Sequence, residues 1–148
     1  MSAPERIRSI AVHREDVATA LEATLRTDRR VVLRVTPPFS GRMRARLHEA
    51  GGDPADGSGP GSTRAPLSGV RPDGTIHVDP RDLVADVPPY PEADDTAAAH
   101  PDADVGVRRD RHAETVSAWR ERARRGVVGS VVLELEAGTR SVDVVALG

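Results

Sequence analysis

The segment TPPFSGRMRAR (residues 36–46) carries residue types that bind phosphate groups. Arginine occupies every second position after Ser40 and Gly41, from Arg42 to Arg46. If a strand ends and a helix begins at the Ser-Gly pair, the unpaired backbone N–H groups and the helix dipole favour an anion. Arg42 and Arg46 then share one helix face, and each guanidinium fork can bind two phosphate oxygens. We therefore predict an anion or nucleic-acid contact at Ser40, Gly41, Arg42 and Arg46.

The same segment also has a purely structural interpretation. Ser40 is a common helix N-cap residue, Phe39 can cover the edge of the core, and Met43 and Leu47 can pack inward. The segment has neither the GK[ST] ending of a P-loop nor the GxGxxG pattern of a dinucleotide site. Both interpretations stay open.

A second basic segment, residues 109–126, has the length and spacing of a helix. Arginines on a helix are typical of nucleic-acid binding, so Arg120 and Arg124 join the predicted contact surface. The arginines are spread around the helix, however, and some can pair with carboxylates such as Glu134 or Glu136. Trp119 is expected in the core.

Two further segments could do chemistry. His77 and Asp79 lie on one side of a short strand, where His100 or His112 could complete a metal site, but no recurring ligand spacing is visible. We expect no metal, no cofactor and no catalytic residue, and interpret Asp79 as a helix N-cap. Tyr90, between prolines and before several acids, is a predicted partner-binding residue, because proline-rich segments lose little entropy on binding. The alternative is that Tyr90 packs on its own domain.

Composition and charge restrict the class of protein. The 148 residues contain no Lys, Asn, Gln or Cys, and all 21 basic residues are Arg. The absence of Cys excludes disulfides, thiolate catalysis and Cys-ligated zinc. Residues 1–50 have a net charge of +4, residues 51–104 of −8 and residues 105–148 of +2. No apolar run is long enough for a membrane span, and no secretory signal is visible, so we expect a cytoplasmic protein with no membrane contact.

The hydrophobic pattern predicts the α+β class: a mixed sheet of about five strands with three helices, in the order β-α-β-α-β-α-β-β, ending in an antiparallel hairpin. We expect one domain over 1–148, with mobile loops at 51–68 and 85–106. The expected strands are 6–13, 30–36, 75–79, 130–137 and 139–148, and the expected helices are 14–28, 41–52 and 109–126.

The block IHVDPRDLVADVPPYPEADDT (76–96), with the basic helix and the strand VVLELE after it, resembles an uncharacterised haloarchaeal domain-of-unknown-function family. The resemblance is carried mainly by residues 76–137. It implies no activity, cofactor or catalytic residue.

These patterns predict a small non-enzymatic module that contacts RNA or DNA through its arginine-rich ends, with the acidic middle lying over them as a tether or competitor. The same basic surfaces could contact an acidic protein instead of nucleic acid. One alternative is a protein-interaction subunit of a larger complex, which uses the proline, tyrosine and acidic loop and the edge of the C-terminal hairpin. A second alternative is a metal-dependent hydrolase at His77 and Asp79. The oligomeric state stays open.

Overall fold

Two four-stranded sheets and three α-helices make up the part of the chain described by the computed structural model, residues 3–50 and 67–148. The α+β class is therefore confirmed, although two sheets replace the expected single sheet. The predicted loop at 51–68 lies mainly outside the described residues.

Sheet A has the strand order β3-β1-β8-β7. Its strands are β1 (Ser9–His13), β3 (Arg42–Arg44), β7 (Ser130–Leu135) and β8 (Gly138–Leu147). β1 runs parallel to both β3 and β8, and β7 pairs with β8 in the expected antiparallel hairpin. Gly138 has a φ of +126° at the turn of this hairpin, a conformation that favours glycine.

Sheet B has the order β4-β2-β6-β5 and its pairs are antiparallel. Its strands are β2 (Val31–Val35), β4 (Arg46–Glu49), β5 (Gly69–Val70) and β6 (Ile76–Val78). β2 and β6 are almost completely buried because they occupy the middle of the sheet. β4 is an edge strand and is mostly exposed.

The three helices differ in how much they bury. α1 (Arg14–Arg26) follows β1 directly, and its buried face contributes Val17 and Leu21 to the core. α3 (Val105–Arg125) is capped at its start by Asp104, whose carboxylate accepts from the Val107 N–H at 2.8 Å, and at its end by Gly126. Only Trp119 and Ala123 of α3 are buried, so this helix touches the body only through its second half.

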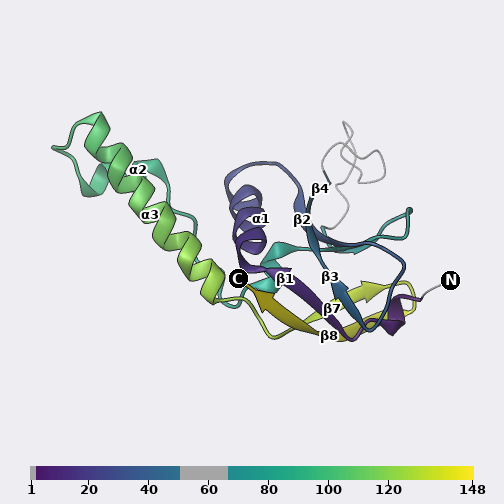
Figure 1. Cartoon of the computed structure of the whole chain (residues 1–148). Helices are drawn as coiled ribbons and strands as arrows, with labels where there is room; N and C mark the ends of the chain where they lie inside the picture. Colours follow the sequence, from purple (N-terminus) through teal and green to yellow (C-terminus); the bar gives the residue numbers. More distant parts are fainter. Residues whose placement is uncertain (1–2, 51–66) are drawn as a thin grey trace.

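α2 (Ala93–Ala99) lies within residues 85–106, where the sequence predicts a loop. Figure 1 shows α2 beside the far end of α3, with both helices extending away from the sheets and from the N-terminus. We call residues 92–116 the helical arm. Asp79 caps a short 3-10 helix (Pro80–Leu83) by accepting from the Arg81 N–H at 2.9 Å, which confirms its predicted role.

Apolar side chains from both sheets and α1 form the core. Ile10, Val12, Leu33 and Ile76 are completely buried, and each contributes about 1.5–3 kcal/mol relative to exposure. The chain joins the sheets at Ala45, which separates β3 from β4. Ala45 is also completely buried, and its N–H donates to the Ala11 carbonyl of β1 at 2.9 Å.

The predicted helix over 41–52 is wrong for every residue of it that the structure describes. β3 and β4 occupy residues 42–49 instead. The alternation decides the matter physically: Arg42, Arg44 and Arg46 are exposed, whereas Met43 is half-buried and Ala45 is fully buried. A period of two residues is that of a strand.

Candidate nucleic-acid interface

Three exposed arginines at alternate positions lie on β3 and at the start of β4, and we call this segment the arginine ribbon (residues 42–46). Alternate residues of a strand are about 6–7 Å apart on one face, so Arg42 and Arg44 lie next to each other on β3, and Arg46 follows beyond Ala45. Arg42 and Arg44 pair in register with Ser9 and Ala11 of β1. The spacing on which the prediction rested is therefore that of a strand row, not of one helix face.

The bend at Ala45 divides the row between the two sheets. Arg46 belongs to sheet B, where its register partner is the half-buried Arg34 of β2. Both halves of the ribbon are edge strands, with β1 or β2 on one side only. Charged side chains on an edge strand also discourage pairing with other chains, so the row has a structural role whether or not it binds a ligand.

Ser40 and Gly41 precede a strand and cap no helix, which corrects the predicted N-terminal anion site. The Ser40 hydroxyl donates to the Arg42 carbonyl at 2.9 Å, closing a tight turn. The Gly41 carbonyl accepts from the N–H groups of Arg8 and Ser9 at 2.8 and 3.0 Å. These bonds fix the start of the ribbon against the segment that leads into β1.

A hollow of about 590 Å³ lies at this start of the ribbon, and we call it the arginine hollow. Four arginines, two carboxylates, one serine and one glycine line it: Glu5, Arg6, Arg8, Ser9, Gly41, Arg42, Arg140 and Asp143. Four cations and two anions leave a net charge of +2. Three segments that are distant in sequence thus bring their arginines together at one place.

Backbone hydrogen bonds explain why the segments meet there. The Arg8 carbonyl accepts from the Asp143 N–H of β8 at 2.9 Å. The Arg140 side chain crosses to the same segment, and its Nε donates to the Ile7 carbonyl at 2.9 Å. Ile7 is completely buried, so this segment is anchored in the core while Arg6 and Arg8 on either side of it point outward.

The arginines of the ribbon and the hollow keep their charges available. Within residues 3–50 and 67–148, no carboxylate oxygen lies within 4.0 Å of a guanidinium nitrogen of Arg6, Arg8, Arg42, Arg44 or Arg46. Glu5 and Asp143 line the hollow without forming such pairs. The surface can therefore accept an anion without first breaking an ion pair to a described residue.

Arg120 and Arg124, in contrast, are ion-paired with carboxylates of α1. Arg120 donates to Glu22 Oε1 and to Thr19 Oγ1, both at 2.9 Å, and also pairs with Glu15. Arg124 pairs with Glu15 as well. The partners lie on α1, not on the sheet carboxylates Glu134 and Glu136 that the sequence suggested. The hydrogen bond from Arg120 is the main cause that holds the pKa of Glu15 below its usual value.

The structure does not bring the four predicted arginines together. Arg42 and Arg46 lie on the ribbon, whereas Arg120 and Arg124 lie between α3 and α1. Residues 92–104 of the acidic middle pack on α3 in the basic C-terminal block, where Arg108 Nε donates to the His100 carbonyl at 3.1 Å, and they lie away from the ribbon (Figure 1).

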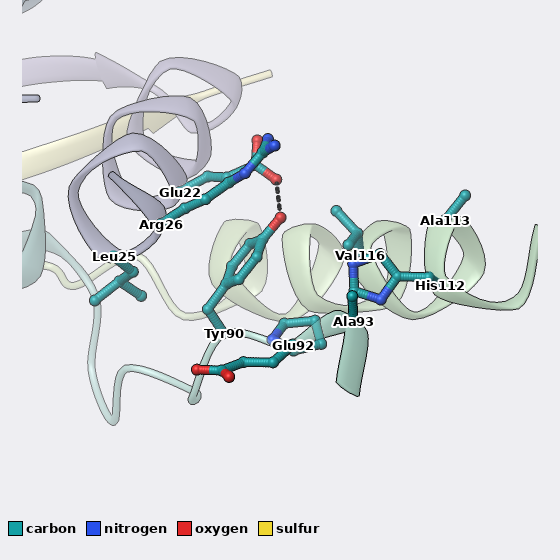
Figure 2. Close-up of a pocket in the computed structure, with 10 residues that line it drawn as sticks. Glu22, Leu25, Arg26, Tyr90, Glu92, Ala93, His112, Ala113 and Val116 are labelled. Atoms are coloured by element: carbon teal, nitrogen blue, oxygen red, sulfur yellow. Dashed lines mark hydrogen bonds between the residues drawn. The ribbon is translucent and has the colours of Figure 1, made fainter. Parts of the chain in front are cut away.

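Tyr90 packs against its own chain. Its hydroxyl donates to Glu22 Oε2 at 2.9 Å, and its ring meets Trp119 edge-on at a centroid distance of 5.0 Å. Figure 2 shows the Tyr90 side chain directed toward α1, at one side of a cavity of about 560 Å³ that reaches Val116 and His112 of α3. Trp119 is in the core as predicted, and its Nε1 donates to the Pro88 carbonyl at 2.9 Å.

His77 and Asp79 each bind an arginine side chain, His77 through a hydrogen bond and Asp79 through an ion pair. His77 is 3% exposed, and its Nδ1 accepts from Arg71 Nε at 3.0 Å. Burial is the main cause that lowers the pKa of His77 to about 4, and the neighbouring charges of Arg71, His48 and Arg34 add to it. Asp79 pairs with Arg81 at 2.8 Å. Among the residues that the structure describes, no group of three or more His, Asp or Glu is placed to hold a metal ion.

Comparison with known protein families identifies the family of this chain. The model of the family described as Domain of unknown function (DUF8009) matches residues 1–148. The chain belongs to this family. The predicted resemblance to a domain-of-unknown-function family is confirmed, and the DUF8009 match extends beyond residues 76–137 to the whole sequence. No curated protein and no solved structure matches the chain.

Arg6, Arg8 and Arg140 are not among the residues that the sequence predicts for the site. Arg6 and Arg8 flank the apolar Ile7, and that alternation was a usable signal, since it puts both arginines on the side away from the core. Arg140 had no such signal, because its place in the hollow depends on β8 pairing with β1. None of the helices in the described ranges has both the length and the apolar character needed to cross a membrane.

Proposed function

We propose that this chain is a non-enzymatic module that binds the phosphate backbone of nucleic acid along the arginine ribbon. The observation that carries the proposal is the set of three exposed arginines at alternate positions along two successive edge strands, Arg42, Arg44 and Arg46, the first of which also lines the hollow. Charge-assisted contacts from arginine to phosphate are the main source of affinity in sequence-independent binding.

The aromatic residues support backbone contact over base recognition. The chain has one Phe, one Tyr and one Trp. Phe39 and Trp119 are buried, and Tyr90 is bonded to Glu22. Proteins that bind single strands stack bases on exposed aromatic rings, and these three rings are not placed for it. We therefore expect little sequence preference and no advantage for single strands.

A salt titration with labelled 20-base-pair duplexes of random sequence, one of DNA and one of RNA, tests the proposal by fluorescence anisotropy. If three or four phosphates are contacted, the slope of log K against log salt is about −3 to −4. An absence of binding to both duplexes at 50 mM salt would overturn it.

A second candidate function, docking to a partner protein, is supported by the helical arm. Residues 92–104 carry five acids and no arginine: Glu92, Asp94, Asp95, Asp102 and Asp104. This segment projects from the body (Figure 1) and would suit a basic protein surface. Affinity capture by the wild type and by the D94S/D95S variant tests it: basic proteins retained equally well by both would count against the arm.

A further inference from the structure

We propose that the arginine hollow binds a phosphate monoester, the terminal phosphate at the end of a nucleic-acid strand. This inference rests on the proposed function and adds a ligand class for one site within it. Internal backbone phosphates would lie along Arg44 and Arg46, while the terminal phosphate would enter the hollow.

Charge favours a monoester over an internal diester in this place. A phosphate monoester carries about −1.5 to −2 at pH 7, whereas each internal phosphate carries one charge. The lining of the hollow has four arginines against Glu5 and Asp143, a positive excess of two. One doubly charged group therefore balances the hollow, and the two carboxylates oppose the entry of further anions.

Arg140 is held in position before any ligand arrives. Its Nε is bound to the Ile7 carbonyl at 2.9 Å, and the residue is half-buried on β8. The guanidinium plane is thereby fixed, so less side-chain entropy is lost when its other nitrogens meet an anion. Arg6 and Arg8 are exposed and can close on a ligand from the other side, and Ser9 adds a hydroxyl.

Arg42 connects the hollow to the ribbon. It lines the hollow and is also the first cation of the exposed row. Arg44 and Arg46 follow at alternate positions, and both are exposed. A nucleic-acid strand whose end lies in the hollow can therefore continue past Arg42 onto the ribbon, and a strand without a terminal phosphate loses only the contacts of the hollow.

The test compares 20-base-pair duplexes that differ only in their ends: 5′-phosphate, 3′-phosphate or hydroxyl at both. We expect one of the phosphorylated duplexes to bind about tenfold more tightly than the hydroxyl duplex, which is the scale of one charge-assisted contact. R140Q should remove this difference between the phosphorylated and the hydroxyl duplexes. R109Q, an exposed arginine of α3, is the matched control and should keep the difference. If R140Q does not fold, R8Q serves the same purpose.

The two proposals fail in different ways. Equal affinity for all three duplexes overturns the terminal-phosphate site and leaves the ribbon proposal standing. If no duplex binds, the proposed function is overturned, and thermal unfolding with 10 mM inorganic phosphate then decides the hollow. A rise in Tm that R140Q abolishes supports an anion site there, whereas an unchanged Tm, or a rise that R140Q retains, overturns it.

Discussion

The arginines of α3 and those of the ribbon have the same chemistry and opposite surroundings. On α3, Arg120 and Arg124 face α1 and share the carboxylates of Glu15 and Glu22. On the ribbon, Arg42 and Arg44 face solvent, and no described carboxylate is within 4.0 Å of them. The helix therefore uses its cations to attach itself to the body, whereas the strand presents them.

The element next to each arginine explains the difference. α1 carries Glu15 and Glu22 about two turns apart on the side that meets α3, so packing of the two helices brings acids to Arg120 and Arg124. An edge strand has a neighbour on one side only, and the outward positions of β1 next to the ribbon are Ser9 and Ala11. Cation count alone thus says little about a binding surface.

Charge reversal on the ribbon should have the largest effect. In the R42E/R44E/R46E variant, each substitution changes the local charge by two units, and an attractive row becomes repulsive. We expect affinity for a random duplex to fall about 1000-fold at 50 mM salt, and the salt dependence to weaken. Anisotropy titrations measure both.

The R109E/R122E/R125E variant is the matched control for this experiment. It changes the net charge equally, at exposed arginines of α3. A similar loss of affinity in both variants would mean that total charge, not the ribbon, determines binding.

His77 in sheet B gives a second comparison, because this buried side chain stays neutral although positively charged arginines lie near it. The pKa of His77 is about 4 in the folded protein and 6.5 as its ordinary value. The unfolded chain therefore binds a proton at higher pH than the folded chain does. Stability from this residue is complete above pH 6.5 and is lost as pH falls toward 4, by on the order of 3 kcal/mol.

Urea unfolding between pH 7.5 and 4.5 measures this effect. H77N keeps an acceptor for Arg71 Nε without a titrating group, so its stability should change less across the same range than that of the wild type. H100N, on the helical arm, is the control and should follow the wild type. Parallel curves for H77N and the wild type would contradict the proton linkage.

Local patterns were sufficient for some elements and not for the ribbon. The hairpin of β7 and β8 and the cap at Asp79 depend on nearby residues, and both were predicted. The segment 42–49 fits both a helix and a strand, since Arg, Met, Ala and Leu have high helix propensity. Pairing with β1 and β2 decides between them, and those contacts are distant in sequence.

The candidate site shows the same division between local features, which the sequence predicts, and contacts between distant residues, which it does not. Arg42 and Arg46 were predicted from composition and spacing, and both are exposed on the ribbon. The partners of Arg120 lie about a hundred residues earlier on α1, and Arg140 meets the segment around Ile7 only through sheet A. No local signal carries such contacts, so pairing between distant charges could not be read from the sequence.

Removal of Arg120 should have a moderate effect on stability and none on binding. R120M leaves Glu22 with only the Tyr90 hydroxyl and leaves Glu15 to Arg124. The pair is partly buried, with 22% and 19% of the Arg120 and Glu22 side chains exposed, so we expect a loss of about 1–3 kcal/mol. Urea unfolding measures the loss, and anisotropy should show unchanged affinity.

The Arg120 contact also has a pH signature. The pKa of Glu15 is lowered in the folded protein, so its contribution is complete above about 4.5 and is lost as pH falls through the folded value. R120M should weaken this dependence. R111M breaks an exposed pair with Glu114 and should cost less than about 0.5 kcal/mol. Equal losses in the two variants would remove the distinction between attaching and exposed arginines.

Neutralisation of Arg122 and Arg125 should have the smallest effect. It tests whether exposure alone is enough for an arginine to bind nucleic acid. Both are exposed near the end of α3, and neither has an ion pair to a described residue. Availability alone would make them equivalent to Arg42 and Arg44. They lie on the curved surface of a helix, where no neighbouring strand adds further arginines beside them. R122Q/R125Q should therefore change duplex affinity less than twofold and stability by less than about 0.5 kcal/mol.

R42Q/R44Q makes the same change on the ribbon and should lower duplex affinity at least tenfold. If the two double variants lose affinity equally, alignment on a strand contributes nothing, and any exposed arginine of this molecule serves as well as another.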